Sequence, residues 1–385
     1  MPHSVKAWFL YPGTGTDIGE LAELVQEDFE LRDISSAEVL AEPLFGCWEG
    51  NMNHALSRKP VDICKQRGEP RVIIGNTGVV RVLEVGSGVE GLKPGDVGII
   101  FCASVVDAWG YPEKAMAYDA PGTMGCLATK MILRPHEIIR IPDDTRHSLP
   151  QWAAFSGRYV TAWSNWLQAH GSFRLQVPRE ELPSPHVWGW GGGTTLAELD
   201  LARRHGCTTV MLSGNDRRLE LIRKTGVTAL DRRQFGELGY DERRFVIDAG
   251  YRRSYLEAEG RFLEEVERRT AGMKVQIFVD YIGTPVFRAT LKALGRQGVI
   301  TSAGWKEGMV LSMLRASECI ARHQHVNTHY ARYPQGVDAV AYAEAEGWMP
   351  EVDERIYGFD EIPELARRFS EGDVGFFPVF SINAR

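Results

Sequence analysis

The sequence has no run of about 18 consecutive apolar residues, and its opening stretch "MPHSVKAWFLYPG" lacks the charged-then-apolar order of a secretory signal peptide. These absences favour a cytoplasmic protein with no membrane anchor. A basic excess is absent too, because 44 Lys and Arg stand against 51 Asp and Glu, for a net charge of -7. Nucleic acids and anionic membranes select basic surfaces, so we expect neither as a partner and favour a small or carrier-linked substrate.

Cysteine is scarce, with six residues in a chain of 385 and no two of them close in sequence. This spacing predicts reduced thiols and excludes both a disulfide framework and a zinc ribbon. Tandem repeats and low-complexity tracts are also absent, while 44% of the residues are hydrophobic. A chain of this length and composition can bury a large core and is expected to form two domains.

What the sequence does contain changes in character near residue 150. Residues 1–150 hold short β-rich runs such as "RVIIGNTGVVRVLEVGSGV", whereas residues 151–330 alternate strand-like and helical runs, as in "PHVWGW" followed by "TTLAELDLARRHG". Strict alternation predicts βαβ units, and so an α/β fold with a doubly wound parallel sheet beside a mostly β domain. Residues 331–385 return to a strand, helix, strand pattern that could complete the first domain. The charged stretch over residues 240–272 is expected to be a solvated helical insertion.

A glycine cluster follows the first strand of the alternating region. Gly189, Gly191, Gly192 and Gly193 lead into a predicted helix. Bare backbone at a helix N-terminus lets N–H groups and the positive helix end approach a pyrophosphate, so we expect a dinucleotide there. Glycines also occur where two backbones merely pack closely, and the spacing alone leaves that alternative open.

The end of the next predicted strand indicates which dinucleotide binds. An acidic residue that contacts the ribose hydroxyls is usual there in NAD-binding folds, but this chain has Ser213, followed by Arg217 and Arg218. A small hydroxyl residue and two arginines suit a 2′-phosphate, which favours NADP(H) over NAD(H). Alternatively, the two arginines only decorate a helix start next to Asp216.

The order of "VVRVLEVGSGVEGLKPGDVG", "AAFSGRYVTAW", "WGWGGGTTLAEL" and "IFVDYIGTPVFRATLKALGRQGVITSAG" resembles the medium-chain dehydrogenase/reductase superfamily. The resemblance implies a GroES-like β-barrel catalytic domain that the C-terminal segment completes, a Rossmann domain, and an active cleft between the two. It also implies that Thr161 packs near the nicotinamide, with Gly283 and the turn containing Gly304 on its far side.

The zinc ligands of the alcohol dehydrogenases in this superfamily are not matched. Cys47 stands near the first ligand position, but the Gly-His-Glu stretch reads Gly75, Asn76, Thr77, and no cysteine occurs around Phe155. Neither Asn nor Thr is a credible zinc ligand, so we predict a zinc-independent member with no metal site. The histidines at 323, 325 and 329 could share one face of a strand, but no second cluster of donors accompanies them.

Further motifs resemble the zinc-free enoyl-thioester reductases, and within these the crotonyl-CoA carboxylase/reductases: "GNMNHALSRKPV", "AWGYP", "DRRQF" and "HVNTHYARY". The resemblance places Asn51 and His329 at the acyl end of the cleft, for carbonyl polarisation or proton delivery, with His54 in reserve. Pro112 stands where that subfamily has a Glu, so plain reduction is favoured over carboxylation. Asn51 could instead be an ordinary turn residue.

Together these observations predict an NADPH-dependent reductase of an activated C=C bond. The substrate is an enoyl thioester, on CoA or a carrier protein, or an enone, and a homodimer is expected. Three alternatives stay open: a reductive carboxylase of an enoyl-CoA, a catalytically silent cofactor-binding protein, and a metal-dependent alcohol dehydrogenase.

Overall fold

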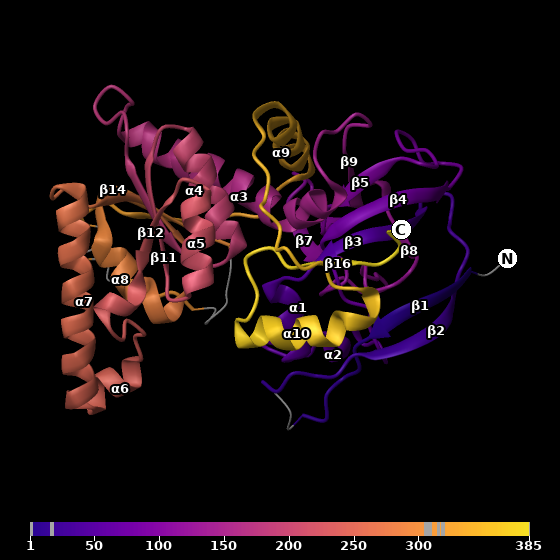
Figure 1. The fold of residues 1–385 in the computed structure, drawn as a ribbon, viewed down its shortest axis with the longest axis horizontal. Helices are drawn as coiled ribbons and strands as arrows, with labels where there is room; N and C mark the ends of the chain where they lie inside the picture. Colours follow the sequence, from indigo (N-terminus) through magenta and orange to yellow (C-terminus); the bar gives the residue numbers. More distant parts are fainter. Residues whose placement is uncertain (1–2, 16–18, 304–309, 314–315, 317–319, 385) are drawn as a thin grey trace. The chain divides into compact units, whose positions relative to one another are not determined.

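The computed structural model describes the chain except for residues 1–2, 16–18, 304–309, 314–315, 317–319 and 385. It divides into two compact units, one of residues 1–160 and 331–385 and the other of residues 161–330. Helix α3 (Leu149–Gln176) contributes to both, so the division falls inside this helix rather than before it (Figure 1).

The first unit is built on an antiparallel sheet. Its strands are β3 (Val39–Cys47), β4 (Gly78–Val85), β5 (Val97–Ile100), β8 (Met131–Leu133), β9 (Ile138–Arg140) and β16 (Val379–Ser381). Two hairpins accompany it, β1 (His3–Phe9) with β2 (Val25–Leu31) and β6 (Ala103–Val106) with β7 (Pro112–Ala115). The helices are α1 (Gly50–Leu56), α2 (Ile63–Arg67), α9 (Tyr333–Glu346) and α10 (Ile362–Glu371).

The C-terminal segment adds strand β16 to this sheet, antiparallel to β3. The fully buried ring of Phe380 lies directly over Gly46, where even a Cβ atom would collide with it. Phe380 also packs edge-on against Trp48, with ring centroids 6.5 Å apart. Because Gly46 of β3 has no side chain, the ring of Phe380 can pack on it and hold the C-terminal segment against the sheet.

The second unit is a six-stranded sheet in which all paired strands are parallel. Its strands run in the order β12 (Thr228–Asp231), β11 (Thr208–Ser213), β10 (His186–Trp190), β13 (Val275–Asp280), β14 (Leu294–Ser302), β15 (His325–Thr328). Numbered along the chain, this is the 3-2-1-4-5-6 order of a dinucleotide-binding Rossmann sheet, with its switch point between β10 and β13. The predicted fold class is confirmed.

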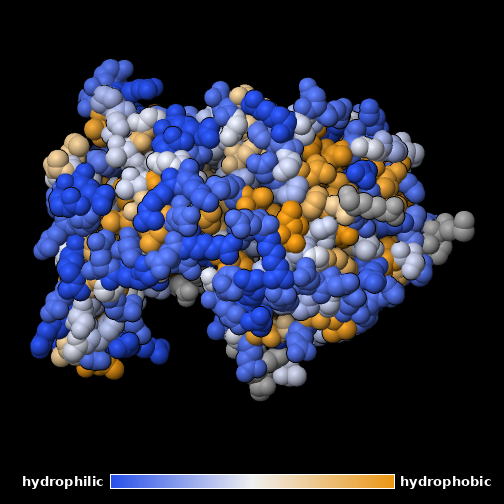
Figure 2. All heavy atoms as spheres, in the orientation of Figure 1, coloured by the Kyte–Doolittle hydropathy of each residue, from blue (hydrophilic) through white to orange (hydrophobic). Residues whose placement is uncertain are grey.

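Helices α4 (Gly193–Arg204), α5 (Asp216–Lys224), α7 (Ala249–Thr270) and α8 (Thr284–Ala293) pack around the sheet, and α6 (Glu242–Ile247) lies against α7 (Figure 1). The prediction of a merely solvated helix over residues 240–272 is wrong for α7. Its inner face is buried, and Phe262 packs against Trp188 and Trp190 with ring centroids 6.5 and 5.2 Å away. Most of the charged residues of α7 belong to the outer face, whereas Glu259 is buried and pairs with Arg288 and Lys292 of α8. Hydrophilic side chains cover much of the molecular face in Figure 2. Within the described residues, no helix combines the length and apolarity needed to cross a membrane.

Candidate active site

The parallel sheet brings several of the predicted site residues to one edge. Gly191 follows β10, Ser213 ends β11, Gly283 follows β13, and His329 follows β15. Because these strands are parallel, their carboxyl ends lie on the same side, where Rossmann sheets bind their ligands. His325 begins β15 and belongs to the opposite edge; its Nε2 lies 3.2 Å from the Gln297 Oε1.

The glycines of the cluster differ in what surrounds them. A Cβ atom on Gly189 would lie 2.8 Å from the Thr195 Cγ2 and 2.9 Å from the Val279 carbonyl oxygen. On Gly191, whose φ is +153°, it would collide with the Thr195 Oγ1. Packing against the protein itself therefore explains these two glycines. A Cβ atom on Gly192 would meet nothing within 4 Å among the described residues, so this position faces open space.

Helix α4 presents an unblocked N-terminus at this position. Its N-cap is Gly192, which has no side chain to accept from the first backbone N–H groups, and its first turn, which starts at Gly193, contains no acidic residue. Unsatisfied N–H groups and the positive end of the helix dipole favour an anion. The open side of Gly192 and this helix end together fit a bound pyrophosphate.

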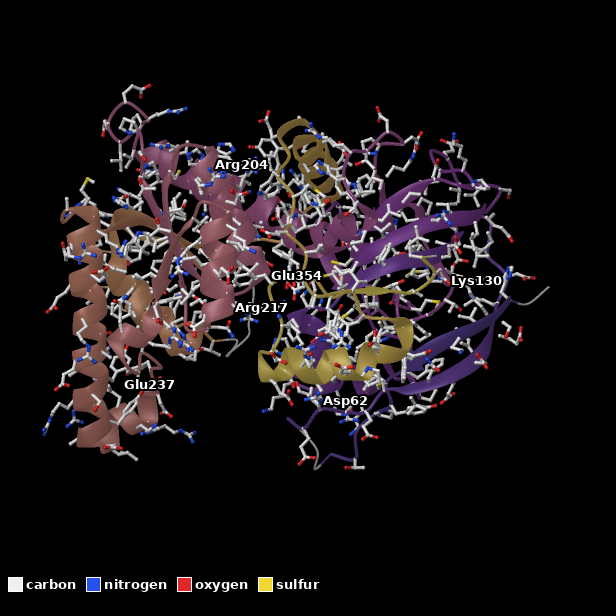
Figure 3. The ribbon with its side chains drawn as sticks, in the orientation of Figure 1. Asp62, Lys130, Arg204, Arg217, Glu237 and Glu354 are labelled. Atoms are coloured by element: carbon white, nitrogen blue, oxygen red, sulfur yellow. The ribbon has the colours of Figure 1, made fainter. Side chains whose placement is uncertain are left out.

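The second strand ends in a turn that is fixed locally. The Ser213 hydroxyl oxygen accepts from the Asn215 N–H at 3.3 Å, and the Asn215 side chain caps α5 by accepting from the Arg218 N–H at 3.1 Å. Arg217, labelled in Figure 3, is exposed, and Arg218 is partly buried. Asp216, the residue that argued against a phosphate here, is exposed and paired with Arg233.

Arg232 is a candidate that the sequence reasoning missed. It follows β12, whose Asp231 pairs in register with Ser213 of β11, and its guanidinium lies so close to Gly214 that a Cβ there would be 2.9 Å from its Nε. The available signal was the arginine pair in "DRRQF", which follows the second strand after the glycine cluster. Its position becomes apparent only when adjacent parallel strands align their carboxyl ends.

The turn after β13 is held by a buried carboxylate. The Asp280 Oδ1 accepts from the N–H groups of Ile282 and Gly283 at 3.1 and 3.0 Å, and its Oδ2 accepts from the Thr290 hydroxyl at 2.7 Å. Burial raises the pKa of Asp280. Gly283 has a φ of +96°, a conformation that favours glycine, so this turn explains its identity. The predicted Gly304 lies outside the described residues.

Thr161 and His329 are tied together by a residue that the sequence did not single out. The fully buried Asn165 on α3 donates from its Nδ2 to the Thr161 carbonyl at 2.9 Å and to the His329 carbonyl at 3.0 Å. Two predicted site residues from distant parts of the second unit thus share one anchor.

Asn51 and His54 lie in the first unit, three residues apart on α1. The Asn51 Nδ2 donates to the Oδ1 of the buried Asn76 at 2.8 Å, while the Asn51 Oδ1 is buried without a hydrogen-bond partner among the described residues. An orphaned buried polar atom costs about 1–3 kcal/mol, so such atoms mark places where a ligand can bind. The two amides can flip together, which exchanges the orphaned acceptor for an N–H donor.

Cys47, the residue nearest a zinc-ligand position, is engaged by a buried cation. The Arg158 Nη1 donates to the Cys47 Sγ at 2.8 Å, the Arg158 Nη2 donates to the Trp48 carbonyl at 2.5 Å, and the Glu49 carboxylate lies 3.4 Å from the guanidinium. Burial raises the pKa of the Cys47 thiol to about 12. The residues at this place do not fit a zinc ion, because a ligating thiolate is disfavoured and a guanidinium occupies its side.

Across the part of the chain that the structure describes, no group of three or more His, Cys, Asp or Glu side chains is arranged to hold a metal ion.

Comparison with known proteins agrees with this geometry. No protein-family model matches the chain. The crotonyl-CoA reductase of Streptomyces avermitilis is 21% identical over 328 residues, which cover 82% of this chain and 70% of that protein. The solved crotonyl-CoA carboxylase/reductase AntE, in complex with NADP, superposes with a TM-score of 0.80 at 19% identity and covers 99% of this chain and 95% of that one.

Two further solved structures have a similar fold. The 2-octenoyl-CoA carboxylase reductase CinF, solved with NADP and 2-octenoyl-CoA, gives a TM-score of 0.82 at 16% identity, over 99% of this chain and 88% of that one. The CAD of Helicobacter pylori complexed with NADP(H) gives a TM-score of 0.73 at 14% identity, over the full length of both chains.

A Rossmann sheet in one chain with an antiparallel β unit is the fold of the medium-chain dehydrogenase/reductase superfamily, and this chain has that fold. The sequence is similar to crotonyl-CoA reductases, so the resemblance stated from the motifs is confirmed.

Proposed function

We propose that this chain is an NADPH-dependent reductase that delivers hydride to the activated C=C bond of an α,β-unsaturated acyl thioester. An NADP(H)-dependent oxidoreductase agrees with the relatives, which are crotonyl-CoA reductases, and with the solved structures that contain NADP. The observation that supports reduction of an acyl thioester is the amide of Asn51, whose oxygen has no hydrogen-bond partner among the described residues. It lies beside Asn76, which stands where the zinc-dependent members have their histidine ligand.

The residues of the second unit fit NADP(H). The pyrophosphate would lie on the open side of Gly192 at the N-terminus of α4, and the 2′-phosphate would be held by Ser213 with Arg217 and Arg218. When bound, NADPH supplies the hydride for the reaction. Arg232, which lies against the same turn, would add a third positive charge to that end of the site.

Hydride addition to the β-carbon of an enoyl thioester leaves negative charge on the carbonyl oxygen. Asn51, in the flipped form of its pair with Asn76, would donate an N–H to that oxygen, and His329 would deliver the proton to the α-carbon, with His54 as the alternative donor. Such a hydrogen-bond donor does the work that a metal does in the alcohol dehydrogenases, so no metal is required for this step.

Reductive carboxylation is the second candidate, because AntE and CinF are named carboxylase/reductases. Pro112 argues against it: it begins β7 and has no polar side chain at the position where the resemblance expects a Glu. The next residue, Glu113, is exposed. We therefore place simple reduction first.

The deciding experiment follows NADPH oxidation with crotonyl-CoA, a longer enoyl thioester, an enone and a quinone, with and without bicarbonate, and measures product masses. We expect thioester products heavier by two hydrogens in both buffers. A product heavier by a carboxyl group would establish the second candidate, and Pro112→Glu tests whether that residue is what prevents it. Stoichiometric NADPH binding without turnover would instead indicate a catalytically silent protein.

Asn51→Ala tests the proposed role of the amide. Loss of one oxyanion donor lowers turnover by about a hundred- to a thousand-fold. The matched control is Asn53→Ala on the same helix, because the Asn53 Oδ1 accepts from the Trp48 Nε1 at 2.7 Å and serves packing. The control should lower the melting temperature while leaving turnover within a few-fold of the wild type. Comparison of CoA-bound with carrier-bound substrates, and light scattering for a dimer, complete the description.

A further inference from the structure

A chain of buried polar groups extends from Asn165 through the second unit. Besides donating to the carbonyls of Thr161 and His329, Asn165 accepts at its Oδ1 from the Thr301 hydroxyl at 3.3 Å. Thr301 lies on β14 and is fully buried. Its side chain is also within hydrogen-bonding reach of the Tyr281 hydroxyl.

The chain ends at a buried carboxyl group. The Tyr281 hydroxyl lies 2.5 Å from the Oε2 of Glu198, which is on α4 and fully buried. The other carboxyl oxygen of Glu198 has no hydrogen-bond partner among the described residues. Burial raises the pKa of Glu198 to about 8, and the hydrogen bond with Tyr281 opposes this rise.

The hydroxyl groups of Tyr281 and Thr301 each have a buried acceptor. The Tyr281 hydroxyl donates to the Glu198 Oε2, and the Thr301 hydroxyl donates to the Asn165 Oδ1. The Asn165 amide is then fixed with its Nδ2 toward the two carbonyls, because the opposite orientation would set N–H against a hydroxyl proton and oxygen against oxygen. Buried hydrogen bonds of this kind favour a single arrangement of the groups that they join.

We propose that Asn165 is a positioning residue for the nicotinamide end of the site, and that the buried Glu198, Tyr281 and Thr301 side chains fix the orientation of its amide. Asn165 holds the backbone of Thr161 on α3 to the backbone of His329 after β15, which sets where these two residues stand at the sheet edge. The inference rests on the proposed function in that Thr161 and His329 are the groups assigned to the nicotinamide and the acyl group.

The test uses the full-length protein and Asn165→Leu, which has a similar volume but no hydrogen-bonding groups. A misplacement of about 1 Å costs about a hundred-fold in rate, so we expect turnover at saturating substrate to fall by roughly that factor. The affinity for NADPH, set by the distant phosphate contacts, should change only a few-fold. Thr301→Val, which keeps the carbonyl contacts but removes the orienting hydroxyl, should show an intermediate loss.

Thr270→Val is the matched control for lost stability. Thr270 is buried at the other end of the unit, where its hydroxyl donates to the Val266 carbonyl at 2.8 Å and accepts from the Lys274 N–H at 2.9 Å. This variant should melt earlier and keep its turnover. An equal fall of turnover in Asn165→Leu and Thr270→Val would overturn the proposal.

A substrate-free measurement separates this inference from the proposed function. The emission of bound NADPH reports the surroundings of the nicotinamide whether or not any thioester is reduced, and we expect Asn165→Leu to shift it toward the emission of free NADPH. Unchanged emission in a folded Asn165→Leu overturns the inference. If Asn165→Leu does not fold, the same measurement on Thr301→Val decides. Absence of thioester turnover in the wild type, with the shift still observed, counts only against the proposed function.

Discussion

Replacing Glu198 with Gln should remove a pH dependence from the stability of the Rossmann unit. The carboxyl group is fully buried, and burial raises its pKa from 4.5 to about 8. Gln has the same shape, cannot ionise, and can accept from the Tyr281 hydroxyl at its Oε1 as the carboxyl oxygen does. The variant therefore keeps the packing and removes only the titration.

The sign and size follow from proton linkage. Below pH 4.5 the carboxyl is protonated in both the folded and the unfolded chain, and it adds no pH dependence. Between pH 4.5 and about 8 only the unfolded chain is ionised, so the folded state loses about 1.4 kcal/mol of stability for each pH unit as the pH rises. From pH 6 to pH 8, the wild type should lose about 2 kcal/mol relative to Glu198→Gln.

Urea unfolding of both proteins at pH 6, 7 and 8 measures this difference. Tryptophan fluorescence follows the unfolding, and the buried Trp188 and Trp190 of this unit contribute to the signal. Taking the difference between the two proteins cancels the titration of all other groups. A difference that stays constant over this pH range would refute the reasoning, because it would mean that Glu198 is already ionised in the folded protein at pH 6.

Two further predictions concern the cofactor. Gly192→Val should abolish NADPH binding in isothermal titration while leaving the melting temperature nearly unchanged, because the valine side chain would point into open space. The control Gly191→Val should instead unfold the unit, because its side chain would collide with Thr195. Normal NADPH affinity in Gly192→Val would contradict the placement of the pyrophosphate. The double variant Arg217→Ala, Arg218→Ala should weaken NADPH binding by about ten- to a hundred-fold and leave NADH binding unaltered, since charge-assisted pairs contribute about 1.5–3 kcal/mol. Equal affinity of the wild type for the two cofactors would contradict the assigned role of the arginines.

Much of the fold followed from periodicity in the sequence. The alternation of apolar runs with helical patterns after residue 150 predicted the parallel sheet, since strands covered on both faces are mostly apolar, as in the fully buried β13, where four of the six residues are Val, Ile or Phe. The order of the strands could not be obtained from periodicity alone and came from the resemblance. The buried face of α7 was missed because its charged residues outnumber the apolar ones that contact the sheet.

The sequence indicated the local geometry of the candidate site where one segment determines it, but not where distant segments meet. The strand, glycine and helix order placed Gly192 at a helix N-terminus. Which glycines serve packing depends on Thr195 and on the neighbouring strand, and this was not visible in their spacing. Asn165 carried no signal, because nothing in a helical "TAWSNW" indicates that its amide reaches the backbone 164 residues further on.

The surroundings of Cys47 favour metal-free reduction of an enoyl thioester over zinc-dependent oxidation of an alcohol. A thiol with its pKa raised to about 12 stays protonated at physiological pH, and the Arg158 guanidinium donates to its sulfur. Metal binding there would require loss of the thiol proton and displacement of a buried cation that Glu49 also contacts, and both changes oppose binding of a second cation. Oxidation of an alcohol needs an agent that stabilises an alkoxide, which zinc provides in the alcohol dehydrogenases. Reduction of an enoyl thioester needs only hydrogen bonds to an enolate oxygen, and these are within the capacity of an amide such as Asn51.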